Sequence, residues 1–88
     1  MNNSNINYER TSPRVIQAAN GTGNTAITCA KPSIGFAIKN TGAASLTITI
    51  NAITITVAAS ETFDDNFNVF NSVTIAATDT FKYLVRGR

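Results

Sequence analysis

The chain has 88 residues, of which 43% are hydrophobic and 14% charged, and its formal net charge is +2. This length allows a single domain. Because the chain has no histidine and only one cysteine, Cys29, neither an intrachain disulfide nor a zinc-finger ligand set can form. The lysines and arginines are scattered along the sequence, whereas nucleic-acid binders cluster such charges. We therefore expect no nucleic-acid partner.

The charged fraction is well below the roughly 25% of an average soluble domain, and Thr, Ser and Asn replace the missing charges. A neutral polar surface repels a second copy only weakly, and covering it requires little desolvation of charge. We therefore expect a homo-oligomer, with a trimer favoured and a dimer as the alternative. No apolar run approaches the roughly 20 residues of a membrane helix, and the sequence MNNSNINYER lacks the apolar centre of a signal peptide. We expect no membrane partner and synthesis in the cytoplasm.

Residues 1–14 are rich in Asn and Ser and contain Pro13. The segment as a whole shows neither a helical nor a strand period, which predicts an extended N-terminal arm. Two interpretations stay open: a frayed tail, as is common at termini, or an arm that wraps a neighbouring subunit. The candidate docking residues of this arm are Ile6, Tyr8, Arg10 and Arg14.

Residues 15–88 are a succession of short β-favouring runs separated by Gly, Asn, Pro and Ser. This pattern predicts an all-β domain, a small antiparallel β-sandwich of jelly-roll or Ig-like type with about seven strands. The sequence Lys31-Pro32-Ser33 is expected to separate the second strand from the third. The expected strands are 15–19, 25–29, 34–39, 46–50, 53–57, 72–77 and 80–86.

The segment 46–57 reads LTITI, then Asn51-Ala52, then ITITV. If Asn51 and Ala52 form a two-residue hairpin turn, Ile48 faces Ile55 and all the apolar side chains of both strands lie on one face. The threonines then face one another on the other side, so the alternation and the turn length agree. A type I′ turn needs positive φ at both central positions, which Ala52 tolerates poorly.

The segment 61–70 contains Phe63, Phe67 and Phe70 at spacings of four and three. Such spacing predicts a helical turn or a loop that dips into the core. It also separates the hairpin from the last two expected strands.

The sequence offers no catalytic site. General acid–base and nucleophilic catalysis need a base beside a nucleophile, and histidine, the commonest base, is absent. We therefore expect no enzyme and no cofactor, and we expect Cys29 to be a buried small hydrophobic residue. Glu61, Asp64 and Asp65 lie close together, but they lack the spacing of an EF-hand loop and are expected to form a solvated acidic loop. Whether they hold a cation stays open, and no metal site is predicted.

From Ile34 to Arg88 the chain contains the turn IKNTG, the Thr/Ile hairpin, the loop SETFD and the closing strand VRG. This run resembles small β-sandwich modules of tailed-bacteriophage virion proteins. The chain departs from that pattern at Ala52 and Ser60, where a glycine is the usual residue.

The resemblance implies a virion structural protein, such as a capsid decoration or head-accessory subunit, made in the host cytoplasm. Its partners would be further copies of itself and other virion proteins such as the major capsid protein. The alternative is a stand-alone β-sandwich module that binds carbohydrate or protein.

Overall fold

The structure is a computed structural model that describes residues 14–87. Within these residues every regular element is a β-strand, which confirms the all-β prediction. The strands are β1 (Arg14–Thr22), β2 (Thr25–Asn40), β3 (Leu46–Ile50), β4 (Ile53–Val57), β5 (Thr62–Ala76) and β6 (Thr80–Gly87). The predicted arm, residues 1–14, lies outside the described residues except for Arg14, which begins β1.

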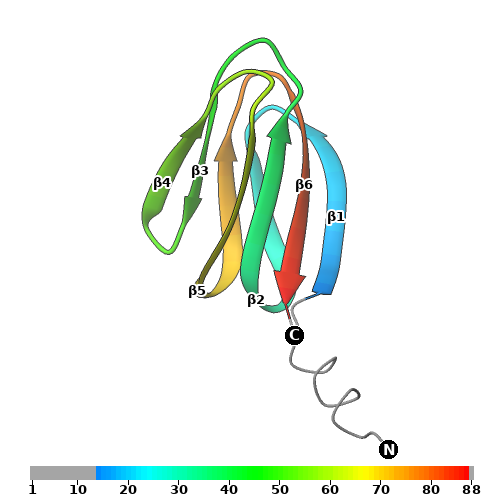
Figure 1. Ribbon diagram of the computed structural model, residues 1–88, viewed down its shortest axis with the longest axis vertical. Helices are drawn as coiled ribbons and strands as arrows, with labels where there is room; N and C mark the ends of the chain where they lie inside the picture. The colour runs from blue at the N-terminus through cyan, green and yellow to red at the C-terminus, as the bar shows by residue number, and fades with distance from the viewer. Residues whose placement is uncertain (1–13, 88) are drawn as a thin grey trace, which may run out of the picture.

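The six strands form one antiparallel sheet in the order β1-β6-β2-β5-β3-β4. β2 and β5 are much longer than the others, with 16 and 15 residues. Residues 25–28 of β2 pair with 72–75 of β5, the register is then interrupted, and residues 33–39 pair with 62–70. Both strands turn back at this interruption, at the lower end of the molecule (Figure 1). The sheet is therefore folded over on itself along a ribbon of two paired strands.

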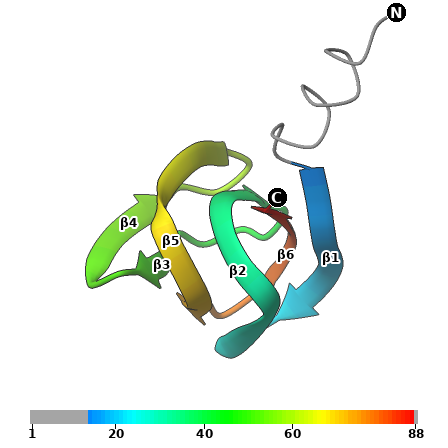
Figure 2. The same cartoon turned by 90° about the horizontal axis from the view of Figure 1, so that it is seen from below.

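The fold brings the two halves of the sheet around one apolar core, and Figure 2 shows the strands curving around a common centre. One half contains β1, β6, the second part of β2 and the first part of β5. The other contains the first part of β2, the second part of β5, β3 and β4. The core residues are Ile27, Cys29, Phe36, Ile38, Leu46, Ile48, Ile50, Val57, Phe70, Val73, Ile75, Phe81 and Val85.

The bend in β2 explains why the structure has six strands rather than the seven expected. Pro32 has no N–H to donate and is tolerated only where a strand leaves its ladder. It lies between Thr28 and Ser33, where the pairing of β2 with β5 is interrupted. The predicted chain break at Lys31-Pro32-Ser33 is thus a fold within one strand.

The segment with the three phenylalanines was wrongly expected to be helical or looped, because it is the first part of β5. Phe63 and Phe67 are separated by two strand periods and both pack against the core, while Phe70 is fully buried next to the bend. The stretch of β5 from Asn66 to Phe70 contains more residues than the stretch of β2 that it pairs with, Ser33 to Gly35. Phe70 follows Phe67 by three residues across this irregularity, so the three phenylalanines together imitate a helical period.

The hairpin of β3 and β4 has the predicted register, with Ile48 opposite Ile55 and Thr49 opposite Thr54. Asn51 and Ala52 form the turn with φ of 51° and 66°, the positive values that a type I′ turn requires. The β3 side chains Leu46, Ile48 and Ile50 are buried, but Ile53 in β4 is 51% exposed. The predicted apolar face is therefore only partly covered along β4.

Asn40 is a buried hydrogen-bonding centre at the upper end of the sheet, with 1% of its surface exposed. Its Nδ2 donates to the carbonyls of Ala44 and Val57, at 2.8 and 3.0 Å, and its Oδ1 accepts from the N–H of Gly42 at 3.0 Å. Its main chain also bonds to Ser60 and Glu61. One side chain thereby holds the two loops that flank the hairpin.

Candidate interaction surfaces

The candidate docking residues predicted from the sequence fall mainly outside the described part of the chain. Ile6, Tyr8 and Arg10 precede it, and only Arg14 is placed, exposed and opposite Gly87 at the start of β1. The start of β1 and the end of β6 lie together at the lower end of the molecule (Figure 1). The arm is therefore joined to the domain at this end.

The three carboxylates of the predicted acidic loop do not converge. Glu61 accepts a hydrogen bond from the N–H of Ala58, and Asp64 forms an ion pair with Arg86. Asp64 and Asp65 are neighbours in a strand and point to opposite faces of the sheet. Residues 14–87 contain no group of three side chains suited to holding a metal ion.

A groove of about 570 Å³ lies between β4 and the first part of β5. We call it the β4–β5 groove. Four of its eight lining residues are apolar, and two of these, Ile53 and Ile55, come from the incompletely covered side of the hairpin. The lining residues are Asn51, Ile53, Ile55, Phe63, Asp65, Asn66, Phe67 and Asn68.

Both strands that border the β4–β5 groove have an unpaired edge. β4 pairs only with β3, and β3 reaches β5 only at residues 74–76. The edge of β5 from residue 62 to 73 therefore has no neighbouring strand in the described part of the chain, and its part from Phe63 to Asn68 borders the groove. The lower end is closed by the side chain of Asn51, whose Nδ2 donates to the carbonyls of Asn68 and Val69 at 3.0 and 3.4 Å.

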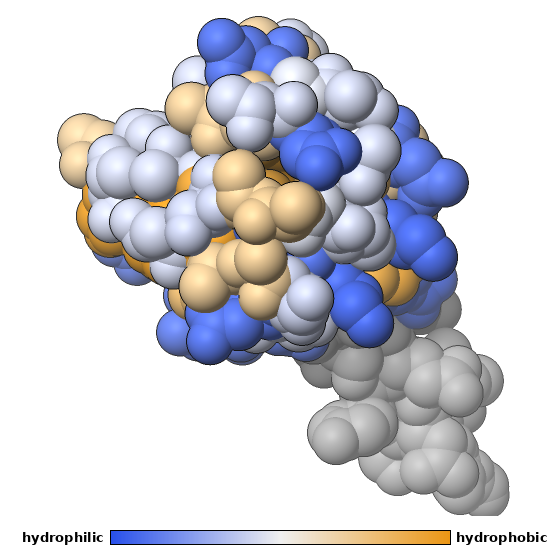
Figure 3. All heavy atoms as spheres, turned by 90° about the horizontal axis from the view of Figure 1, so that it is seen from above, coloured by the Kyte–Doolittle hydropathy of each residue, from blue (hydrophilic) through white to orange (hydrophobic). Residues whose placement is uncertain are grey.

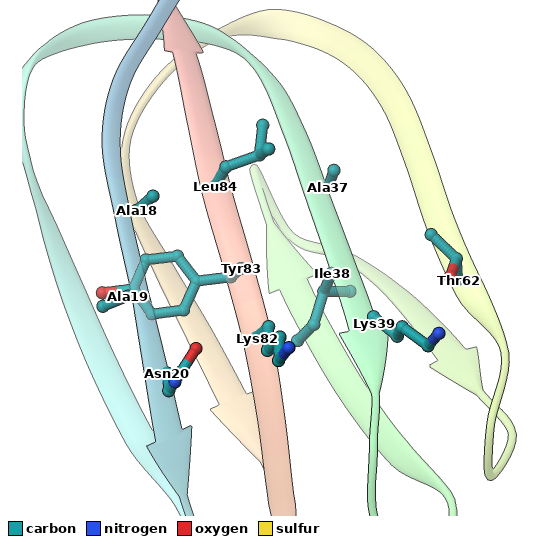
Figure 4. A pocket seen from close by; sticks show the side chains of 10 residues that line it. All are labelled: Ala18, Ala19, Asn20, Ala37, Ile38, Lys39, Thr62, Lys82, Tyr83 and Leu84. Atoms are coloured by element: carbon teal, nitrogen blue, oxygen red, sulfur yellow. The ribbon is translucent and has the colours of Figure 1, made fainter.

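A second, shallow depression of about 500 Å³ lies on the outer face of β1, β6 and β2 (Figure 4). Ala18 and Ala37 flank Leu84 in one row across the strands. In the next row Lys39 lies directly opposite Lys82. We call these five residues the lysine depression, which combines a small apolar floor with two cations on one side.

The β4–β5 groove was missed from the sequence because residues 61–70 were not expected to form a strand. The signal that could have found it is the alternation of Phe63, Asp65 and Phe67. In an extended strand these side chains share one face, so a carboxylate between two phenylalanines marks an apolar row that is not fully covered.

Charged residues make up 14% of the chain. Seen from above, the surface is mostly white and tan with separate blue patches, and orange atoms show at the margin on the side of β3 and β4 (Figure 3). Within residues 14–87 there is no helix long and apolar enough to cross a membrane. Comparison of the chain with protein-family models, curated proteins and solved structures gives no match.

Proposed function

We propose that this chain is a virion structural protein, a capsid decoration or head-accessory subunit that docks as an oligomer. The observation that carries this proposal is the β4–β5 groove, which exposes apolar side chains between two unpaired strand edges. Such edges readily pair with another chain. The resemblance of residues 34–88 to modules of tailed-bacteriophage virion proteins indicates that the assembly is a virion.

In this proposal the folded-over sheet is a small β-sandwich. The subunit acts by covering the surface of another virion protein rather than by catalysing a reaction. Many copies on a lattice gain avidity, so each contact needs little affinity. Low surface charge supports this role because neighbouring copies repel one another weakly. The proposed location is the virion, after synthesis in the host cytoplasm.

The direct test is mass spectrometry of purified particles from cells that carry the gene. We expect the chain in the particles at a stoichiometry comparable to a structural protein, and light scattering of the isolated chain should give an oligomeric mass. Absence from washed particles would overturn the virion role.

The second candidate is a stand-alone module that binds carbohydrate or protein, and the lysine depression favours it. Two lysines beside an apolar floor suit a ligand that carries a carboxylate next to an apolar surface. Screening against neutral and acidic glycans tests this candidate. Retention of acidic glycans that is lost in Lys82→Glu would support it over the virion role.

A further inference from the structure

The β4–β5 groove has the features of a site for one added β-strand. It is bordered by unpaired strand edges, and its floor and walls carry Ile53, Ile55, Phe63 and Phe67. A strand laid along the β5 edge would hydrogen-bond to the backbone and would turn every second side chain into the groove.

The groove also contains a negative charge, the carboxylate of Asp65, which favours a positive charge on the added strand. Asp65 lies opposite the fully buried Phe36, so its carboxylate belongs to the inward-facing row of β5. It accepts a hydrogen bond from the N–H of Asn66 at 2.8 Å and forms no ion pair within residues 14–87. The strand that fills the groove should therefore present apolar side chains and one cation at spacings of two.

The arm contains this pattern. Ile6, Tyr8 and Arg10 are two residues apart, so an extended backbone places them on one side, with Asn7 and Glu9 on the other. In antiparallel pairing with β5, placing Arg10 opposite Asp65 brings Tyr8 opposite Phe67. The apolar match of Tyr8 and the ionic match of Arg10 thus occur in a single register, in which Ile6 falls opposite Val69, at the end of the groove that Asn51 closes.

Measured along the sheet, this groove lies farther from β1 than the arm of the same chain spans. In its half of the sheet, β6, β2 and β5 follow β1 in order, so an added strand beyond β5 lies four strand spacings, about 19 Å, from β1. Arg10 and Arg14 are joined by only residues 11–13, which span at most about 14 Å when fully extended. A neighbouring copy is under no such limit.

We propose that the β4–β5 groove binds residues 6–10 from the arm of a second copy, with Arg10 paired to Asp65. This inference rests on the proposed oligomeric function and names the surface and the segment that make the contact. Exchanged arms of this kind link subunits without requiring a large interface between the domains.

The test uses two charge reversals in the full-length chain, Arg10→Asp and Asp65→Arg, with mass measured by sedimentation velocity. Each variant alone places like charges together and should weaken association at least about tenfold. Mixing the two variants makes every arm complementary to the groove of the other variant, so the mixture should associate under conditions in which neither variant does so alone. Controls that change the net charge equally are Lys82→Asp for the first and Glu61→Arg for the second, both at exposed positions outside the groove lining, and both should associate like wild type.

The remaining outcomes decide against the inference. If both reversals associate like the wild-type oligomer, the groove is not the docking site, although the virion role still stands. If the double variant in one chain recovers association while the mixture does not, the arm docks in its own groove. If the wild-type chain is monomeric at every concentration, self-docking is wrong, and detection in virions separately decides the proposed function. Circular dichroism of each variant verifies that a lost contact does not reflect a lost fold.

Discussion

The buried amide of Asn40 donates a hydrogen bond to the carbonyl of Val57, 3.0 Å away, at the end of the strand that borders the β4–β5 groove. The same side chain bonds to the main chain of Gly42 and Ala44. This amide replaces the sheet ladder at the point where the chain enters and leaves the hairpin.

Replacing Asn40 with Ala should therefore lower the free energy of unfolding by about 2–4 kcal/mol, because several buried main-chain groups lose their partner. Urea unfolding measures the change. Asn68→Ala, at an exposed position, is the matched control and should stay within about 0.5 kcal/mol. Equal effects of the two substitutions would show that the Asn40 contacts carry little stability.

Two non-glycine residues in turns, Ala52 and Ser60, have φ of 66° and 69°. Left-handed backbone costs an L-residue about 1–2 kcal/mol, and glycine removes most of this cost but increases the entropy of the unfolded chain. Ala52→Gly and Ser60→Gly should each raise the melting temperature slightly. Ala76→Gly, in an exposed strand position, should lower stability by about 0.5–1 kcal/mol, and a lowered stability for all three would contradict the assigned turn strain.

The two faces of the hairpin should respond differently to the same new side chain. Ile48 is fully buried, so Ile48→Asn removes apolar burial and leaves an amide without partners, at a cost of about 3–5 kcal/mol. Thr49 lies on the outer face, where its hydroxyl is 3.0 Å from that of Thr54, and Thr49→Asn should cost less than about 1 kcal/mol. Urea unfolding of both variants measures the two losses in the free energy of unfolding. Similar losses would mean that the face is assigned wrongly.

Lys39 and Lys82 are directly opposed on neighbouring strands, an arrangement that destabilises a sheet. Lys82→Gln should raise stability by about 0.2–0.5 kcal/mol at low salt, with a smaller gain at high salt as the repulsion is screened. Thermal unfolding at two ionic strengths measures both effects. Lys31→Gln removes the same charge at the bend of β2 and should show no such gain.

Deleting residues 1–12 should leave the melting temperature of the domain within a few degrees, because the core consists of residues from Ile27 to Val85. The oligomeric mass should fall. Differential scanning calorimetry and light scattering of the truncated chain test the two halves of this prediction. If the truncated chain fails to fold, the arm belongs to the core and the domain boundary is wrong.

The register and the turn of the hairpin were predictable because alternation over two strands and a two-residue turn independently demand the same pairing. The bends in β2 and β5 were not, since they depend on which distant strands pair. Pro32 looks the same in a loop as in a folded strand, and the spacing of Phe67 and Phe70 encodes a strand irregularity that resembles a helical turn. The β4–β5 groove arises from these same long-range pairings. Local sequence patterns therefore cannot show that its lining residues come together in one groove.

Three of the five strand pairings, β3–β4, β2–β5 and β1–β6, are nested in the sequence, and this nesting constrains the order in which the chain can fold. In the sequence, the contact between Lys39 and Thr62 encloses the hairpin at residues 46–57. The contact between Thr25 and Ile75 encloses both of these. The contact between Arg14 and Gly87 encloses all three. Each inner closure shortens the loop that the next one must close, so it lowers the entropy that the next contact loses. We expect the hairpin to nucleate folding, the β2–β5 ribbon to close outward from it, and β1 to join β6 last. The segment that precedes β1 would then become correctly positioned for a neighbour only when the domain is complete, and subunits would associate after folding rather than during it.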